Sequence, residues 1–371
     1  SVNDANSFIG IAVGQSHSAA IRGSDGTAWC WGGNGFGQIG DNSITDKSTP
    51  TSVVGGISFT SIASGGDHTV AIGGGTGYLW SWGLNSYGQL GNGTITNSSS
   101  PVSLSGSFGT ASFIKVACGL SHTVAIMGSD GSAWAWGHND KGQIGSTAAT
   151  GGSFSIPASV AGNHSWKDVR CMGAGAIGLR WDNTVWYWGL AAANLLLSPQ
   201  FPCFISTINF PIKISLKLPV AQLALGNYYL SPSTLIRLST GQCYAMGFPN
   251  FGQLGFNDLN FAFTPRSVVG EYNWSHVTTG GNHSAGIRAS DGRLFAWGSN
   301  GFGQLGMGDI ASSYSSPISV NDANSFVDVD CGNSHTVAIM GVDGSAWAWG
   351  YGAYGELGDG NRTSRSVPVS V

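Results

Sequence analysis

The sequence contains few charged residues. Asp, Glu, Lys and Arg make up 9% of its 371 residues, the formal net charge is −4, and no run of Lys or Arg occurs. A protein that binds nucleic acid needs a clustered basic surface to neutralise phosphates, so this composition argues against a nucleic-acid partner. Glu271 and Glu356 are the only glutamates, and many aspartates fall in turn-like stretches, where their side chains bond to the nearby backbone.

The chain also lacks long apolar runs and familiar catalytic motifs. No stretch reaches the roughly 18 apolar residues of a membrane span, so we expect no membrane insertion, and no signal peptide is visible. There is no Walker loop, no H-E-x-x-H and no paired Cys-x-x-Cys. We therefore expect that the protein is not an enzyme and binds no cofactor or metal.

A tryptophan and glycine block repeats along the whole chain. An aromatic pair closed by glycine, such as Trp29-Cys30-Trp31-Gly32, recurs seven times, with its glycine at positions 32, 83, 137, 189, 247, 298 and 350. A regular spacing of about 50 residues is typical of a repeat protein in which each unit packs against its neighbours. Seven such units occupy almost all of residues 1–371, so we predict a single domain.

Each unit has the pattern of four short antiparallel strands. In the first unit, residues 8–13 and 18–21 form two apolar runs, Asp25-Gly26 is a hairpin turn, and Trp29 and Trp31 share one face of a third strand. Aromatic rings of that size need cover from a neighbouring sheet. A fourth strand lies near a proline, Pro50 in this unit, which suits an outer edge.

Four strands repeated radially predict an all-β, seven-bladed β-propeller with almost no helix, in which the paired tryptophans are buried between blades. Residues 1–8 are identical to residues 319–326, so the chain begins at the point of the repeat where it ends. This agreement predicts a closed ring, although it does not indicate which strand closes it.

The motifs G-x-x-H-[ST]-x-A-[IL], W-x-W-G and N-x-x-G-Q-[LI]-G resemble the repeats of the regulator of chromosome condensation family. The resemblance covers the whole chain, although the motif is degraded between about 170 and 245. It implies a seven-bladed propeller. It does not fix the function, because propellers of this family serve as nucleotide exchange factors, ubiquitin-ligase appendages, ciliary scaffolds and bacterial or viral binding proteins.

Histidine and cysteine recur at equivalent positions of different units. The histidines are His17, His68, His122, His283 and His335, and the fourth and fifth units have Gly175 and Tyr229 at this position. A shared metal requires donors about 2 Å from one ion, so we interpret these histidines as hydrogen-bonded residues near the bend between the first two strands. The cysteines are Cys118, Cys171 and Cys331, which we interpret as small core residues rather than disulfide partners.

One aromatic residue precedes the Gly-Gln-Leu/Ile-Gly step in five units. These residues are Phe36, Tyr87, Phe251, Phe302 and Tyr354, and the third unit has Lys141 instead. Arranged around one face of a propeller, they could stack on a sugar or a peptide. The alternative is that they wedge between adjacent blades.

The strongest departure from the repeat lies between residues 190 and 233, where an apolar segment replaces the glycine-rich turn. Its large apolar residues include Leu195, Leu196, Leu197, Phe201, Phe204, Phe210 and Ile212. Contiguous apolar surface on a soluble protein usually marks an interface, so we predict that this segment contacts another chain. The alternative is a repaired blade in which these side chains pack internally.

Taken together, these observations predict a non-enzymatic binding or structural propeller whose partner is a protein or a neighbouring subunit. Abundant Gly, Ser, Thr and Asn with little charge are frequent in virion and extracellular proteins, so we favour those locations over the cytoplasm. One alternative is a guanine nucleotide exchange factor for a small GTPase, although no residues match the protrusion and acidic contacts this activity needs. Another is a lectin that binds glycans through the aromatic ring by multivalency.

Overall fold

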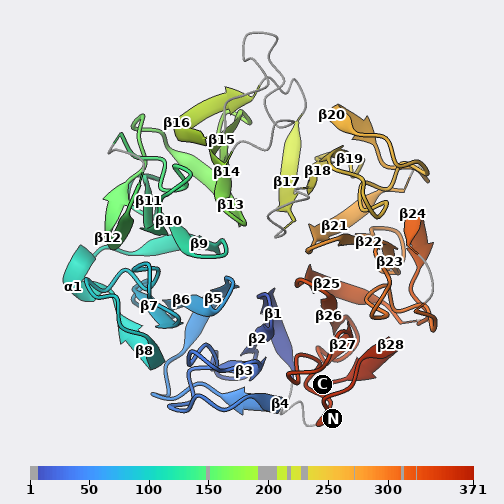
Figure 1. The fold of residues 1–371 in the computed structure, drawn as a ribbon, viewed down its shortest axis with the longest axis horizontal. Coiled ribbons are helices and arrows are strands. Elements are labelled where there is room, and N and C mark those ends of the chain that lie inside the picture. The colour runs from blue at the N-terminus through green and yellow to red at the C-terminus, as the bar shows by residue number, and fades with distance from the viewer. Residues whose placement is uncertain are drawn as a thin grey trace.

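Seven four-stranded antiparallel sheets surround a central axis (Figure 1). The computed structural model describes residues 7–147, 151–190, 207–214, 219–226, 233–270, 272–310, 313–322 and 324–371. Within these residues each sheet contains four strands that are consecutive in sequence, and α1 (Ser105–Phe108) is a short helix of four residues. The predicted seven-bladed all-β propeller is confirmed.

The seven blades follow one another in chain order. Blade 1 has β1 (Phe8–Val13), β2 (His17–Arg22), β3 (Ala28–Gly32) and β4 (Lys47–Ser52), and blade 2 has β5 (Phe59–Ser64), β6 (His68–Gly73), β7 (Leu79–Gly83) and β8 (Ser98–Ser103). Blade 3 has β9 (Phe113–Cys118), β10 (His122–Met127), β11 (Ala133–His138) and β12 (Ser153–Ser159), and blade 4 has β13 (Trp166–Met172), β14 (Gly175–Arg180), β15 (Val185–Leu190) and β16 (Thr207–Ile214). Blade 5 has β17 (Val220–Leu225), β18 (Ser233–Leu238), β19 (Cys243–Gly247) and β20 (Ala262–Ser267). Blade 6 has β21 (Trp274–Thr279), β22 (His283–Arg288), β23 (Leu294–Gly298) and β24 (Tyr314–Ser319), and blade 7 has β25 (Phe326–Cys331), β26 (His335–Met340), β27 (Ala346–Gly350) and β28 (Arg365–Ser370).

The predicted Asp-Gly turn joins the second and third strands. In blade 1, Asp25 Oδ1 accepts the N–H of Thr27 at 3.0 Å, and Gly26 has a φ of 73°. A side chain at Gly26 would be strained at this φ, and its Cβ would lie 2.3 Å from Ser58 Oγ of the next blade. Glycine is therefore required both by the turn and by the close approach of blade 2.

The two tryptophans of each pair are buried to different degrees. Trp31 is completely buried, whereas Trp29 is only partly buried and its Nε1 donates to Thr27 Oγ1 at 3.1 Å in the adjacent turn. Trp82, Trp136, Trp188 and Trp349 are likewise completely buried as the second members of their pairs. Burial between blades is thus confirmed for the second tryptophan and was overestimated for the first, which lies closer to the edge of the blade.

In every blade except blade 5, the second tryptophan of the pair links the blade to the preceding one. Trp82 Nε1 donates to the main-chain carbonyl of Gln38 in blade 1 at 2.9 Å. The same bond joins Trp136 to Gln89, Trp188 to Gln143, Trp297 to Gln253, Trp349 to Gln304 and Trp31 to Glu356, at 2.8 to 3.0 Å. The tryptophan motif of one unit and the Gly-Gln motif of the preceding unit are therefore two halves of one contact.

Four of the five repeated histidines bond to a hydroxyl of the next blade: His17, His68, His283 and His335. His17 Nε2 lies 3.0 Å from Thr69 Oγ1 of blade 2, and that hydroxyl donates to the Gln38 carbonyl at 3.0 Å. Since the hydroxyl proton is directed to the carbonyl, the His17 ring must donate through Nε2. Burial lowers the pKa of His17 to about 4, which keeps the ring neutral. The predicted structural role is confirmed, but the histidine ties neighbouring blades together rather than fixing a bend within one blade.

The histidine position of the fifth unit was assigned wrongly from the sequence. Ser233 pairs with Gly247 in the same register in which His17 pairs with Gly32, so Ser233 and not Tyr229 occupies this position. The segment between the first and second strands is longer in this unit, which displaced the alignment. The assignment of Gly175 in the fourth unit is confirmed by its pairing with Gly189.

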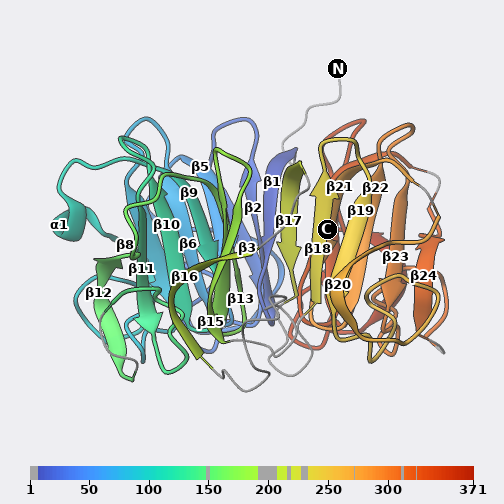
Figure 2. The ribbon, with the colours of Figure 1, turned by 90° about the horizontal axis from the view of Figure 1, so that it is seen from above.

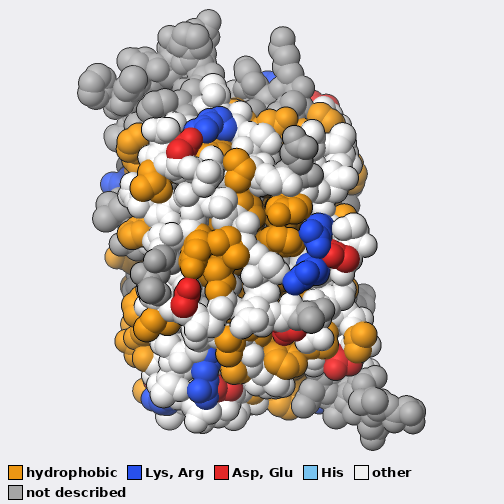
Figure 3. Space-filling model, turned by 90° about the vertical axis from the view of Figure 1, so that its right-hand side faces the viewer, with side chains coloured by type: hydrophobic (Ala, Val, Ile, Leu, Met, Phe, Trp, Pro, Cys, Tyr) orange, Lys and Arg blue, Asp and Glu red, His pale blue; other side chains and the backbone are white. Residues whose placement is uncertain are grey.

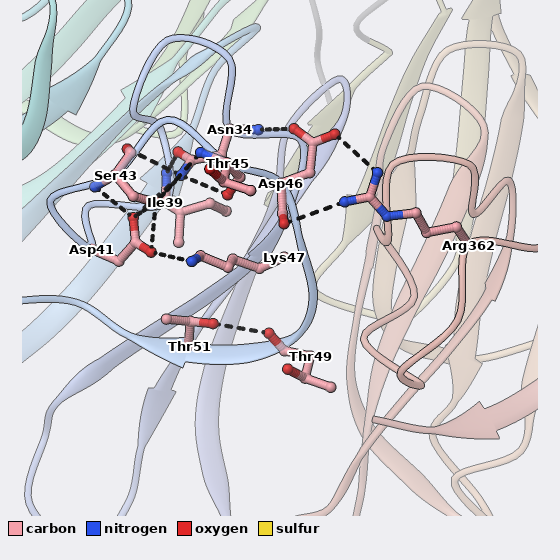
Figure 4. A network of polar contacts seen from close by, with 10 residues as sticks. All are labelled: Asn34, Ile39, Asp41, Ser43, Thr45, Asp46, Lys47, Thr49, Thr51 and Arg362. Carbon is pink, nitrogen blue, oxygen red and sulfur yellow. Dashed lines mark hydrogen bonds and ion pairs between the residues drawn. The ribbon is translucent and has the colours of Figure 1, made fainter.

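The ring closes by contacts between complete blades. Phe8 N donates to the carbonyl of Gly344 at 2.8 Å, and Val13 N donates to Asp330 Oδ2 at 2.9 Å. Near the outer edge, Arg362 of blade 7 reaches Asp46 of blade 1, with Nη1 at 3.5 Å from Oδ2 (Figure 4). No strand is exchanged between blades 7 and 1 in the described part of the chain.

The cysteines are separate from one another in the described residues. Cys30, Cys118, Cys171, Cys243 and Cys331 are free thiols, and all but the partly buried Cys171 are buried. Cys118 Sγ donates to the carbonyl of Ala63 in the preceding blade at 3.7 Å, and Cys171 Sγ to that of Ala117 at 3.5 Å. These thiols pack at blade interfaces, as the interpretation of small core residues expects.

Glu356 occupies the position that glutamine has in the other Gly-Gln turns. Its side chain is 1% exposed, and its Oε2 accepts the N–H of Tyr354 at 2.9 Å. Burial, with a smaller repulsive contribution from Asp46, raises the pKa of Glu356 to about 7. At neutral pH a partly ionised carboxylate therefore lies at the interface that closes the ring.

Replacing Trp136 with Ala should lower the free energy of unfolding by about 3–5 kcal/mol, because the change leaves a large cavity between blades and removes the bond to Gln89. Chemical denaturation measures the change. The control is Trp181→Ala, at a side chain 63% exposed, which should change stability by no more than about 0.5 kcal/mol. Equal denaturation midpoints for Trp136→Ala and the parent would contradict burial of this ring in the native state.

Replacing Glu356 with Gln should remove a pH dependence of stability. The pKa of the carboxyl rises from 4.5 in the unfolded chain to about 7 in the fold. The contribution of this group to the free energy of unfolding is therefore most favourable below pH 4.5, and it is lost as the pH rises to about 7. Glu356→Gln should thus be more stable than the parent above pH 7, by up to about 3 kcal/mol. Denaturation curves at pH 4.5 to 8 measure this, and Gln304→Glu should introduce the same dependence in blade 6. Parallel pH profiles for parent and Glu356→Gln would contradict it.

Candidate functional site

The long loops between the third and fourth strands all emerge on one side of the propeller, which we call the loop face. It is the lower side in Figure 2, opposite the side that holds the Asp-Gly turns. This placement follows from the strand order. Consecutive strands alternate in direction and each blade has four of them, so the third strand of each blade ends on the same side. Outside blade 4, each of these loops begins with the Gly-Gln turn, or with Gly355-Glu356 in blade 7, and continues to the outermost strand.

Each turn is fixed by its own side chains. Gln38 Oε1 accepts the N–H of Phe36 at 3.0 Å, and Asn34 Oδ1 accepts the N–H of Ile39 at 3.0 Å. Asn34 Nδ2 also donates to the carbonyl of Thr45 at 3.1 Å, so one buried amide holds both ends of the loop (Figure 4). Buried side chains that are satisfied by the backbone in this way give the loop a defined conformation.

The five predicted aromatic residues are half-exposed on the loop face. Their exposed fractions are 41% for Phe36, 39% for Tyr87, 41% for Phe251, 45% for Phe302 and 48% for Tyr354. Tyr87 also leans on His138 of the next blade, with ring centroids 4.1 Å apart, and Phe302 leans on Tyr351 at 5.0 Å. At these two sites the ring contacts the next blade, as the wedge alternative expects, and it still presents surface to solvent. Stacking on a sugar or a peptide stays a prediction.

A second apolar set, which sequence reasoning missed, lies on the same loops. Four aliphatic side chains are strongly exposed: Ile44 at 67%, Ile95 at 65%, Leu259 at 61% and Ile310 at 62%. Each follows the closing glycine of the Gly-Gln turn by four residues, which is a signal that the sequence contained. In blade 7 this position is Arg362, the residue that contacts Asp46.

The predicted partner segment is described only in part. Leu195, Leu196, Leu197, Phe201 and Phe204 lie outside the described residues. Phe210 of β16 is 54% exposed, so it remains available for a partner. Ile212 is partly buried and packs against the core cluster of blades 4 and 5, which fits the alternative of a repaired blade at that residue.

The central channel is lined by a set of residues, several of them charged, that sequence reasoning did not group together. The set occupies the third and fifth positions of the innermost strands: Gly10, Ser61, Lys115, Asp168, Gln222, His276 and Asp328 at the third, and Ala12, Ala63, Ala117, Arg170, Ala224, Thr278 and Asp330 at the fifth. A cavity of about 340 Å³ lies between these strands. The signal in the sequence is that these two positions vary while the fourth position between them is always Ile, Val or Leu.

The polar channel residues bond mainly to adjacent blades. Thr278 donates to Asp330 Oδ1 at 2.9 Å, while Asp330 Oδ2 accepts the N–H of Val13. Lys115 Nζ lies 3.3 Å from Asp168 Oδ1. Burial, followed by repulsion from Asp330, raises the pKa of Asp328 to about 7. These contacts explain the channel residues as ties between blades rather than as a reactive site.

The described residues contain no candidate metal centre. No group of three or more His, Cys, Asp and Glu residues in this part of the chain is arranged to hold a metal ion. Among the same residues, no helix has the length and apolar character needed to span a membrane.

Comparisons with known proteins agree with the geometry. The profile of the RCC1-like domain matches residues 54–371, and profiles of the regulator of chromosome condensation (RCC1) repeat match residues 25–72 and 8–38. The Ultraviolet-B receptor UVR8 of Arabidopsis thaliana is 30% identical over 374 residues, covering 97% of this chain and 81% of that protein.

Solved structures share the fold at lower identity. Prp20p from Saccharomyces cerevisiae has a TM-score of 0.79 at 19% identity, covering 99% of this chain and 87% of that one. Human WBSCR16 has a TM-score of 0.77 at 22% identity, with 90% and 86% covered. The repeated motifs, the seven blades and these matches together show that the chain belongs to the RCC1-like domain family.

Proposed function

We propose that the protein is a non-enzymatic binding propeller that holds a protein partner on its loop face. The observation that supports this most directly is the paired apolar pattern of the loops. Blades 1, 2, 5 and 6 each present a half-exposed aromatic residue together with an aliphatic residue more than 60% exposed. Aromatic and aliphatic side chains gathered on one face are typical of protein interfaces, where they supply most of the binding energy.

The charges of the loop face are largely compensated within the protein. Lys47 Nζ lies 2.8 Å from Asp41 Oδ2, and Arg365 Nη2 lies 2.7 Å from Asp359 Oδ2. Figure 3 shows the same arrangement on one side of the ring, where Lys and Arg lie beside Asp or Glu among separate hydrophobic patches. A partner of this face would therefore be recognised by apolar contacts and shape more than by net charge.

Relatives give this proposal further support. Prp20p has binding properties to Gsp1p and histones, and yeast RCC1 has been crystallised with Kap60 bound. These partners belong to those proteins, and this chain shares only the fold with them. A virion or extracellular location stays a prediction from composition, and so does the absence of enzymatic activity.

The test is capture of the partner by the intact protein from its native source, with chemical cross-linking and mass spectrometry to map contacts. The variant Phe36→Ser with Tyr87→Ser should reduce recovery of a specific partner at least tenfold, because it removes apolar surface from two adjacent blades. The control combines Val342→Ser and Trp181→Ser, which alter side chains 88% and 63% exposed at turns on the opposite face. That control should leave recovery unchanged.

Four results would redirect the proposal. If both double variants bind like the parent, or both lose binding equally, the loop face does not hold the partner. Accelerated nucleotide release from a small GTPase would instead indicate an exchange factor, and binding on a glycan array that is lost in Phe36→Ser with Tyr87→Ser would indicate a lectin.

A further inference from the structure

The interface between blades 4 and 5 has lost both halves of the repeated contact. Blade 5 has Met246 where the other blades have the second tryptophan, and blade 4 has no Gly-Gln turn in its sequence. The two losses lie in different units, about 50 residues apart, yet they meet at one interface. A buried indole N–H without an acceptor would cost about 1–3 kcal/mol, so a side chain without a donor is the compatible replacement.

Among the described residues, a second repeated contact, a main-chain hydrogen bond between blades, is also absent from the interface between blades 4 and 5. At the six other interfaces, the first residue of the innermost strand donates its N–H to a glycine carbonyl of the preceding blade: Phe59 to Gly26, Phe113 to Gly77, Trp166 to Gly131, Trp274 to Gly241, Phe326 to Gly292 and Phe8 to Gly344. The equivalent residue of blade 5, Val220, makes no such bond to the described residues of blade 4. The Tyr187 hydroxyl, which lies in the core between the two blades, donates to the Leu190 carbonyl of its own blade.

Aliphatic packing fills this interface instead. One core cluster joins Ile177 and Leu179 of blade 4 to Leu223, Ile236 and Met246 of blade 5. Hydrophobic contact is non-directional, whereas the hydrogen bonds at the other interfaces require a fixed geometry. Two blades that meet mainly through aliphatic side chains can separate or slide more easily than blades joined by the repeated indole and main-chain bonds.

We propose that the propeller ring opens locally between blades 4 and 5, in preference to its other six interfaces. Opening there separates β13 and β14 from β17 and β18 and exposes the aliphatic side chains of this cluster, while the other six interfaces keep their indole bonds. Local openings of this kind occur where stabilising contacts are fewest. The proposal is independent of the function proposed for the loop face.

The chain contains reporters for testing it. Cys118 and Cys331 are buried at the last position of the innermost strands of blades 3 and 7. Leu225 has the same position in blade 5 and is 8% exposed, and Val13 has it in blade 1 at 7%. Leu225→Cys therefore places a thiol at the interface in question, and Val13→Cys is a matched control at the interface that joins blades 7 and 1.

The experiment is pulsed thiol alkylation of the folded protein, with the rate at each cysteine read by peptide mass spectrometry. In Leu225→Cys, the introduced thiol should react at least tenfold faster than Cys118 and Cys331 of the same molecule. In Val13→Cys, the introduced thiol should react no faster than those two. Equal rates at all three sites would mean that the whole ring unfolds at once, and an equally fast thiol in Val13→Cys would place the opening elsewhere; either result overturns the proposal.

A second measurement uses the unaltered protein, in case Leu225→Cys itself loosens the interface. Hydrogen exchange should show amide protection in β17 at least tenfold lower than in the equivalent strands β5 and β25. Equal protection in these three strands would overturn the proposal even if the introduced thiol reacts quickly.

Discussion

The hydrogen bond from a buried indole to the main-chain carbonyl of the preceding Gly-Gln turn is the contact on which this ring depends. The same glutamine that offers its carbonyl to Trp82 also accepts the Phe36 N–H with its side chain and receives the Thr69 hydroxyl. One residue thus shapes the turn, positions the next blade and holds an aromatic side chain on the loop face. Fold and candidate binding surface are consequences of the same local structure.

Blades 4 and 5 show what happens when this contact is absent. The sequence of blade 4 lacks the Gly-Gln motif, and in blade 5 Met246 packs with aliphatic neighbours at the position of the indole. Blade 7 shows a milder change, since Glu356 keeps the carbonyl and the turn but buries an ionisable group. The repeat therefore tolerates a change of side chain more easily than loss of the backbone acceptor, because an unsatisfied buried donor is costly.

Much of the candidate site could be recognised from the sequence, but not its exposure. The five aromatic residues share one position of the repeat, so the repeat pattern is enough to group them. Their half-exposed state depends on side chains of the next blade, such as His138 beside Tyr87, which lie about 50 residues away. The aliphatic set at Ile44 and its equivalents was visible in the spacing. The channel charges were harder to group, because they come from only three of the seven innermost strands, β9, β13 and β25.

The sequence by itself determined the number of blades, the four strands of each, the Asp-Gly turns and the closed ring, because these follow from the pattern within each repeat and from its recurrence along the chain. Only the tertiary structure decided that Trp31 is buried while Trp29 is partly exposed, that His17 donates to Thr69 of the next blade, and that Ser233 takes the histidine position in blade 5. The reason is physical: burial and hydrogen-bond partners are set by residues one full repeat away, and a pattern within one repeat does not contain its neighbour.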